Sequence, residues 1–131
     1  MAKPIVLDST AVLAVLFDEP GAPRIVDQLP ESLLSSVNLA EIQSHLNAHS
    51  YTAAAAWDRL LSMGFEVVPF SEDQARLAAD LAANSRSRPL GLAERACLAL
   101  AIERNATVYT TNRAWKNLPK LASTLEVVLI A

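Results

Sequence analysis

The sequence predicts an α/β fold, a three-layer α/β/α sandwich with a mostly parallel central sheet. Short apolar runs of strand length alternate along the chain with longer segments whose apolar residues recur at helical spacing. The short runs are mostly apolar, as expected for strands that are covered on both faces. No Pro/Gly/Ser-rich stretch divides the 131 residues, so we expect a single domain over residues 1–131.

The first part of the chain begins as a strand that leads into a helix. Residues 4–8 form a β-rich apolar run, and residues 11–17 suit a buried helix that a Pro-Gly pair ends. A second short helix is expected at residues 22–29 and a short strand at residues 32–36. These assignments make up the first strand–helix–strand unit.

The middle of the chain alternates in the same way. Apolar residues at helical spacing predict helices at residues 37–48 and 51–63, and residues 65–70 have the composition of a strand. Ser71 and Gln74 form a capping-box pattern, which predicts that the next helix starts there.

The last part of the chain contains a helix and two strands. Residues 86–89 are expected to form a loop, and residues 92–104 a strongly apolar helix. Strands are expected at residues 107–110 and 125–130. The chain shows no internal repeat.

Composition favours a folded cytoplasmic protein. Hydrophobic residues make up 52% of the chain and charged residues 19%, so there is ample apolar surface to bury. No apolar stretch reaches membrane-spanning length, and we expect no association with a membrane. The single cysteine, Cys97, excludes an internal disulfide, and its apolar neighbours predict a buried core residue.

Charge is unevenly distributed along the chain. The net charge is −3, but residues 84–120 carry seven basic and two acidic side chains. A basic segment of this kind can meet a phosphate backbone. Ordinary solvated helix and loop charges explain it equally well.

Polar residues follow two of the expected strands. Asp8 ends the first strand, and Asn112 lies just past the strand that ends at Thr110. In a parallel sheet the carboxyl ends of the strands share one edge, where ligands bind. We therefore expect Asp8 and Asn112 to stand on the same rim.

Two glutamates occupy similar positions near expected helix starts. Glu41 is the third residue after Asn38, which approximates a capping box and suggests that Asn38 caps its helix. Glu94 suits a helix N-terminus, and Asp8 suits a helix cap. Taken singly, Glu41 and Glu94 are adequately explained by these structural roles.

Taken together, the four positions lie in segments that resemble a known family. The segments IVLDSTA, SVNLAE, LGLAERACLALA and YTTNRAW resemble, in order and spacing, the four motifs of PIN domains. They are most similar to the VapC toxins of bacterial toxin–antitoxin pairs. The resemblance spans almost the whole chain and implies a PIN-like fold with metal-dependent endoribonuclease activity.

The resemblance also implies how the site works. Acidic side chains would hold one or two Mg²⁺ or Mn²⁺ ions for hydrolysis of an RNA phosphodiester, and such hard cations take oxygen ligands. Ser9 and Thr110 would be hydroxyls that support the ligands. The catalytic and metal-binding set that it implies is Asp8, Glu41, Glu94 and Asn112.

The chain departs from the family pattern at two of these positions. Glu94 and Asn112 stand where the family usually has aspartate. Glutamate keeps the charge and lengthens the side chain by one methylene, whereas asparagine keeps an oxygen but removes a negative charge. The alternative to an active toxin is therefore a weakened or inactive PIN module that binds RNA or a protein partner.

Several basic residues are candidates for contacting RNA. Trp115 is expected to pack against the sheet rather than to stack on a base, and Arg95 to pair with a carboxylate. The candidates for RNA contact are Arg113, Lys116, Arg86 and Arg88.

The helix pair within residues 39–63 is rich in apolar side chains. Their number can be larger than one core can bury, and the excess would then form an exposed groove. The resemblance implies that a cognate VapB-like antitoxin binds such a groove and that the toxin forms a homodimer. A role confined to the core explains the same residues.

Glu41, His45 and His49 follow one another at steps of four residues, as a helical zinc site would require. The motif of helical zinc hydrolases has a glutamate directly after its first histidine, and here His45 is followed by leucine. We therefore assign the histidines to a polar helix face.

Overall fold

The computed structural model describes residues 3–48, 52–84, 89–117 and 125–131. In these ranges five strands form one sheet in the order β3-β2-β1-β4-β5, and every pairing is parallel. The strands are β1 (Ile5–Leu7), β2 (Ser32–Ser35), β3 (Glu66–Val68), β4 (Thr107–Thr110) and β5 (Glu126–Leu129). The parallel sheet confirms the predicted fold class, and β1 lies at its centre.

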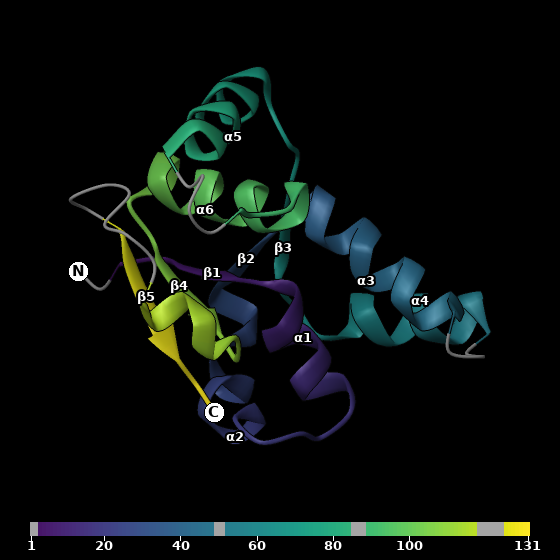
Figure 1. Ribbon diagram of the computed structural model, residues 1–131. Helices are drawn as coiled ribbons and strands as arrows, with labels where there is room; N and C mark the ends of the chain where they lie inside the picture. The colour runs from purple at the N-terminus through teal and green to yellow at the C-terminus, as the bar shows by residue number, and fades with distance from the viewer. Residues whose placement is uncertain (1–2, 49–51, 85–88, 118–124) are drawn as a thin grey trace.

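Helices cover both faces of the sheet (Figure 1). α5 and α6 lie together on one face, and α1 and α2 lie on the other, while α3 and α4 run side by side and project from the body on the side away from β5. The helices are α1 (Ser9–Leu16), α2 (Ala22–Ile25), α3 (Ser36–Ala48), α4 (Ala53–Ser62), α5 (Glu72–Asn84) and α6 (Leu92–Arg104), with 3-10 turns η1 (Val26–Glu31) and η2 (Arg113–Asn117).

Successive residues of each strand supply two separate cores. Val6 and Leu33 face α5 and α6, whereas the next residues, Leu7 and Leu34, face α1, α3 and α4. Cys97 is buried in the first core, as its apolar neighbours predict. The central residues of the strands are apolar because helices cover both faces of the sheet, and polar residues stand at the strand ends, as in the serines that flank Leu33 and Leu34 of β2.

A few element boundaries differ from the prediction. The helix expected at residues 22–29 is the short α2 followed by the 3-10 turn η1, which contains Pro30, a residue that cannot donate a helical hydrogen bond. The 3-10 turn η2 was not predicted. Residue 51 of the fourth expected helix, and residues 86–88 of the expected loop, lie outside the described residues.

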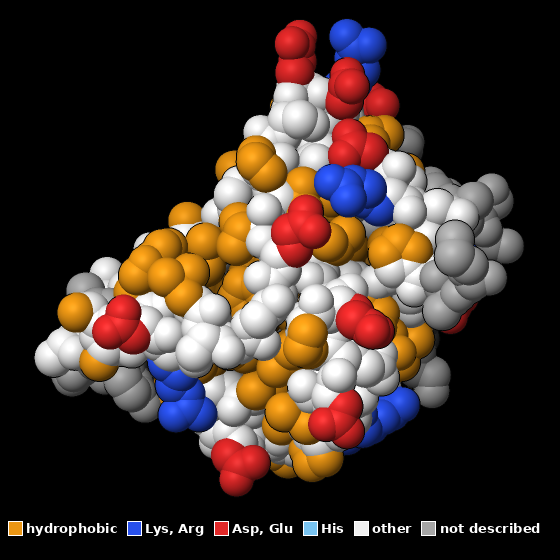
Figure 2. Space-filling view, turned by 180° about the vertical axis from the view of Figure 1, so that it is seen from behind, with side chains coloured by type: hydrophobic (Ala, Val, Ile, Leu, Met, Phe, Trp, Pro, Cys, Tyr) orange, Lys and Arg blue, Asp and Glu red, His pale blue; other side chains and the backbone are white. Residues whose placement is uncertain are grey.

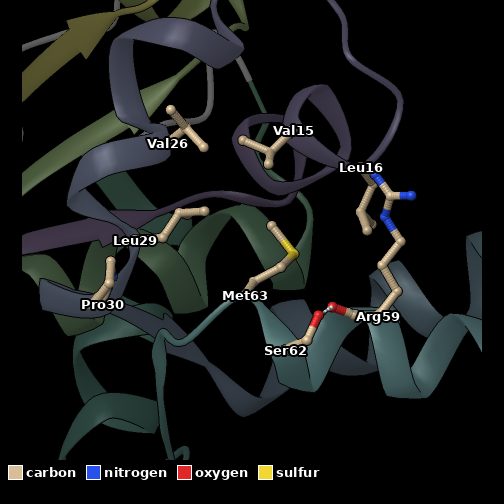
Figure 3. Close-up of a pocket in the computed structure, with 8 residues that line it drawn as sticks. All are labelled: Val15, Leu16, Val26, Leu29, Pro30, Arg59, Ser62 and Met63. Atoms are coloured by element: carbon tan, nitrogen blue, oxygen red, sulfur yellow. Dashed lines mark hydrogen bonds between the residues drawn. The ribbon is translucent and has the colours of Figure 1, made fainter.

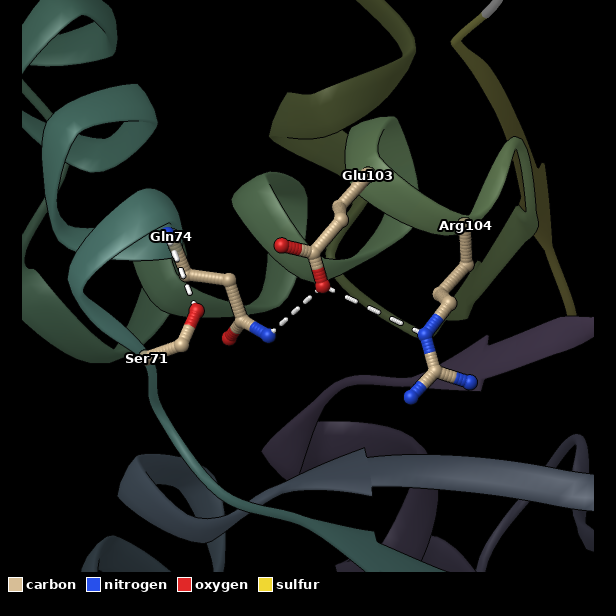
Figure 4. A network of polar contacts seen from close by, with 4 residues as sticks. All are labelled: Ser71, Gln74, Glu103 and Arg104. Atoms are coloured by element: carbon tan, nitrogen blue, oxygen red, sulfur yellow. Dashed lines mark hydrogen bonds and ion pairs between the residues drawn. The ribbon is translucent and has the colours of Figure 1, made fainter.

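A polar contact between α5 and α6 replaces half of the predicted capping box (Figure 4). The Ser71 hydroxyl accepts from the Gln74 backbone N–H at 3.1 Å, so the cap at the start of α5 is present. The Gln74 side chain does not return to Ser71. It is 1% exposed and donates from Nε2 to Oε1 of Glu103 on α6 at 3.0 Å, beside Arg104. The residue that was expected to close the cap therefore links two helices.

No described helix is long and apolar enough to cross a membrane.

The two glycines with positive φ give a test of the packing between the turn before α2 and the segment after β5. Gly21 (φ 99°) and Gly64 (φ 89°) both adopt backbone conformations that alanine disfavours by about 1–2 kcal/mol. A Cβ on Gly21 would lie 2.6 Å from the Ile130 carbonyl oxygen, whereas the nearest atom to a Cβ on Gly64 would be 3.6 Å away. We expect Gly21→Ala to lower the free energy of unfolding by more than Gly64→Ala, measured by urea denaturation. Equal losses in the two variants would contradict the close approach of Gly21 to Ile130.

Candidate active site

A cleft of about 270 Å³ opens at the carboxyl ends of β1 and β4. As predicted from the parallel sheet, Asp8 and Asn112 stand on the same rim. α3 starts directly after β2 and brings Glu41 to this rim, and the first turn of α6 brings Glu94. The residues that line the cleft are Asp8, Ser9, Thr10, Asn38, Glu41, Glu94, Asn112 and Trp115.

Asp8 is the most buried carboxylate of the cleft, with 4% of the residue exposed. It is the N-cap of α1, and its Oδ1 accepts from the backbone N–H of Ala11 at 2.8 Å. The Thr10 hydroxyl lies 2.8 and 2.9 Å from the two carboxylate oxygens, and the Thr110 hydroxyl of β4 donates to Oδ2. The helix-capping role and the placement in the cleft therefore both apply to this residue.

The surroundings of Asp8 make its negative charge costly. Burial is the largest influence and raises the pKa of Asp8 above its ordinary value, while hydrogen bonds from Thr110, Ala11 and Thr10 act in the opposite direction. The nearby carboxylate of Glu41 raises the pKa further. A positive charge in the cleft would relieve this cost, because it favours the ionised carboxylate.

Glu94 is held at both carboxylate oxygens. Its Oε1 accepts from the backbone N–H of Gly91 at 3.0 Å, and its Oε2 accepts from the indole N–H of Trp115 at 3.1 Å. Gly91 is the N-cap of α6 and has no side chain, so only the glutamate half of a capping box forms. The predicted structural role of Glu94 at a helix start and its place in the cleft are thus both present.

Glu41 and Asn112 differ in their exposure and in the contacts that their side chains make. Glu41 is solvent-exposed on α3 and faces the same cleft. Asn112 is half-buried; its Oδ1 accepts from the Ala114 N–H at 3.1 Å, and its backbone carbonyl accepts from the Trp115 N–H at 3.1 Å. Asn112 therefore stabilises the turn into η2.

Asn38 does not cap its helix, contrary to the prediction. It lies in the first turn of α3, is 1% exposed, and donates from Nδ2 to the Ser9 hydroxyl (3.0 Å) and the Ala93 carbonyl (3.2 Å). Because a carbonyl only accepts, this contact fixes the orientation of the amide. The Asn38 Oδ1 is left buried without a hydrogen-bond partner.

Ser9 and Arg95 have hydrogen-bond partners other than those expected from the sequence. The Ser9 hydroxyl contacts Asn38, and the hydroxyl that supports Asp8 beside Thr110 belongs to Thr10, which sequence reasoning missed. Thr10 could have been found from its position two residues after a helix cap. Arg95 pairs with no carboxylate in the described residues; it donates to the backbone carbonyls of Leu90 and Ala78.

The candidates for RNA contact are only partly described. Arg113 is exposed at the start of η2, next to Asn112 on the rim. The side chain of Lys116, and Arg86 and Arg88 altogether, lie outside the described residues. Trp115 is 3% exposed in the core, which confirms that it packs rather than projecting to stack on a base.

The side chains of the cleft suit a hard divalent cation. They offer carboxylate, amide and hydroxyl oxygens, which are the ligands that Mg²⁺ and Mn²⁺ prefer. Among the described residues, no three His, Cys, Asp or Glu side chains converge closely enough to hold a metal by themselves. A bound cation would therefore have few protein ligands and keep several waters, as Mg²⁺ does.

Comparisons with known proteins agree with this architecture. The model of the PIN domain family matches residues 5–121. No curated protein matches the chain. Solved structures with the same fold include VapBC2 from Rickettsia felis bound to a promoter DNA fragment (TM-score 0.77, 20% identity, 97% of this chain and 98% of that one).

Two further structures are similar over most of their length. DNA-bound VapBC from Salmonella typhimurium aligns with a TM-score of 0.74 at 18% identity, covering 100% of both chains. VapC20 from Mycobacterium tuberculosis, described as a toxin that cleaves the Sarcin-Ricin loop, aligns with a TM-score of 0.69 at 18% identity, covering 88% of this chain and 97% of that one. At these identities the structures establish the fold, and the family match over residues 5–121 establishes that the chain belongs to the PIN domain family.

Proposed function

We propose that the chain is a Mg²⁺- or Mn²⁺-dependent endoribonuclease toxin of the VapC type. The observation that carries the proposal is the buried Asp8 carboxylate, which shares one oxygen-lined cleft with Glu41 and Glu94. VapC20, which has the same fold, is described as a toxin that cleaves the Sarcin-Ricin loop. An RNA phosphodiester is therefore the substrate class that we assign to the cleft.

The reaction is hydrolysis of a P–O bond. The oxygen of a water molecule forms a bond to phosphorus, the bond to one ribose oxygen breaks, and that oxygen leaves with a proton. A divalent cation, when bound in the cleft, would make water a better nucleophile at neutral pH and would offset negative charge on the phosphate. Asp8 and Glu94 are the residues that would hold it, and the exposed Glu41 carboxylate is placed to accept a hydrogen bond from a water in the cleft.

A second candidate function is a weakened or inactive PIN module that binds RNA or a protein partner. It is favoured by Asn112, which lacks the charge of the family's usual aspartate and whose Oδ1 is already bonded to the Ala114 N–H. The two candidates differ in what restoring the charge would do. A weakened site gains activity in Asn112→Asp, whereas a site that tolerates asparagine changes little.

Arg113 is exposed and directly follows Asn112, which lines the cleft. With Lys116, Arg86 and Arg88 it remains a proposed contact to RNA. Binding that uses these cations would weaken with salt by roughly 0.7 log units per log unit of salt for each neutralised phosphate.

A groove lined by both apolar and polar side chains is the proposed docking surface for a VapB-like antitoxin. It has a volume of about 510 Å³ and lies between α1, η1 and α4 (Figure 3). Its lining is Val15, Leu16, Val26, Leu29, Pro30, Arg59, Ser62 and Met63. A smaller hollow that shares Leu16 and Arg59 extends it towards Phe17. The R. felis and S. typhimurium structures of this fold are VapBC complexes, which supports a partner of this class.

Apolar side chains are also spread over the face seen in Figure 2, including the arm that α3 and α4 form. A contiguous group of apolar side chains, as seen on this arm, is a feature of protein–protein interfaces. A homodimer in the cytoplasm is the assembly that we propose.

The first test is cleavage of a mixed RNA pool. We expect cutting with Mn²⁺ or Mg²⁺ and none with EDTA. Asp8→Asn should reduce the rate by at least about a hundredfold, beyond the 10- to 100-fold typical of residues that only support a ligand. Asp58→Asn, an exposed change on α4, is the matched control. Absence of cutting under all conditions, restored by Asn112→Asp, would favour the weakened module instead.

Removing the charge of Asp8 should also change stability. Because its folded-state pKa is raised, Asp8 favours folding below the ordinary aspartate pKa of about 3.9, and this contribution is lost as the pH rises through the raised pKa. In EDTA at pH 7, Asp8→Asn should therefore raise the Tm by roughly a few degrees. The difference should shrink towards pH 4, and Mn²⁺ should stabilise the wild type more than the variant. A lower Tm for Asp8→Asn at pH 7 in EDTA would contradict the cost assigned to its charge.

The docking surface is tested by placing a charge inside or outside the groove. Val26 lines the groove and is 47% exposed; Leu61 is 55% exposed and lies outside its lining. Val26→Asp should reduce the antitoxin that copurifies with the tagged chain by about tenfold or more, since it buries a charge against apolar surface. Leu61→Asp should leave copurification unchanged. Equal effects of the two variants would remove the groove as the docking surface.

A further inference from the structure

The indole N–H of Trp115 forms a hydrogen bond with the Glu94 carboxylate. Trp115 belongs to η2 and is 3% exposed, in the same core cluster as Leu98 and Val108. Its Nε1 lies 3.1 Å from Glu94 Oε2, on the first turn of α6. The contact therefore joins the segment after β4 to the helix that carries one of the acidic residues of the cleft.

The chemistry of the indole makes this contact specific. Tryptophan has one N–H donor and no acceptor, so its nitrogen needs an acceptor when the ring is buried. The surrounding cluster is apolar, and the acceptor that it meets is a carboxylate. Hydrogen bonds to a charged acceptor are about twice as strong as neutral ones. The ring thus packs in the core, while its N–H determines where the Glu94 carboxylate lies.

Glu94 is held at two points by donors from different elements. The Gly91 N–H binds Oε1 from the start of α6, and the Trp115 indole binds Oε2 from η2. A carboxylate has about four lone-pair sites, so two bonds leave it able to bind a cation. Two donors on different oxygens restrict rotation of the group. A long glutamate side chain held in this way loses less conformational freedom when it binds a ligand.

We propose that Trp115 is a positioning residue, which holds the Glu94 carboxylate in the orientation that binds a divalent cation in the cleft. The inference rests on the proposed metal-dependent function and adds a residue to the assigned set. Partners that orient a metal ligand typically change metal affinity by 10- to 100-fold when they are removed.

The turn at Asn112 supports the same arrangement. The Trp115 backbone N–H donates to the Asn112 carbonyl, and the Ala114 N–H donates to Asn112 Oδ1. These bonds fix the start of η2 and with it the position of the indole. Asn112 therefore acts on the cleft through Trp115 even though it lacks a negative charge.

The decisive comparison is Trp115→Phe against Trp57→Phe. The first variant keeps an aromatic ring in the core and removes the N–H donor. The second changes the other tryptophan of the chain, which is 39% exposed on α4. We expect the dissociation constant for Mn²⁺, measured by calorimetry, to rise about tenfold in Trp115→Phe and to stay unchanged in Trp57→Phe. Thermal unfolding in EDTA separates loss of packing from loss of metal affinity.

A double-mutant cycle tests whether Trp115 acts through Glu94. In a Glu94→Ala background, Trp115→Phe should have no further effect on Mn²⁺ affinity. In the Trp57→Phe chain one indole N–H signal remains in the NMR spectrum. It should shift, and exchange faster with solvent, when Glu94→Ala removes its acceptor.

The outcomes separate this inference from the proposed function. If the wild type binds Mn²⁺ and Trp115→Phe leaves the affinity unchanged or raises it, the role of Trp115 alone is overturned. The same holds if Trp115→Phe changes the affinity equally with and without Glu94. A wild-type chain that binds no Mn²⁺ would overturn the metal-dependent function and the role of Trp115 with it. If Trp115→Phe weakens Mn²⁺ binding about tenfold, and has no such effect in the Glu94→Ala background, the positioning role is supported.

Discussion

The buried carboxylate of Asp8 ties the centre of the sheet to the helix that follows it. Its oxygens accept from the Ala11 N–H of α1 and from the hydroxyls of Thr10 and Thr110, so β1, α1 and β4 meet at one charged group. These bonds compensate part of the cost of burying the charge, but the pKa of Asp8 remains raised. The cleft therefore contains a group whose electrostatics favour a cation, while α3 brings Asn38 and Glu41 to it and α6 brings Glu94.

Much of the fold could be predicted from the sequence because burial on both faces leaves a simple pattern. Strands of a covered parallel sheet are mostly apolar, and each was identified within two residues of its bounds, whereas η1 and η2 follow no hydrophobic period. The shared rim of Asp8 and Asn112 also follows from the sequence, because parallel strands end at one edge. Glu41 joined the set through the family resemblance. Its position is explained by α3, which starts directly after β2 and places Glu41 in the cleft about one and a half turns from the start of the helix.

The remaining parts of the site depend on contacts between residues distant in sequence. Asn38 was expected to cap a helix, but the packing of α3 against α1 and α6 turns its amide towards Ser9 and Ala93. Arg95 was expected to find a carboxylate and instead satisfies two backbone carbonyls. Trp115 was correctly expected to pack in the core, but the acceptor for its indole N–H is the carboxylate of Glu94, 21 residues away in the sequence. A spacing pattern identifies which face of an element is buried, and it does not specify which polar groups meet there.

The account as a whole depends on a divalent cation binding beside Asp8. The most direct measurement is a crystal structure of the chain soaked in Mn²⁺, with diffraction data collected at the manganese absorption edge. The account predicts an anomalous peak in the cleft, within ligand distance of an Asp8 oxygen and with several waters completing the coordination. A cleft without an anomalous peak at millimolar Mn²⁺, or a peak only at surface carboxylates outside it, would contradict the account.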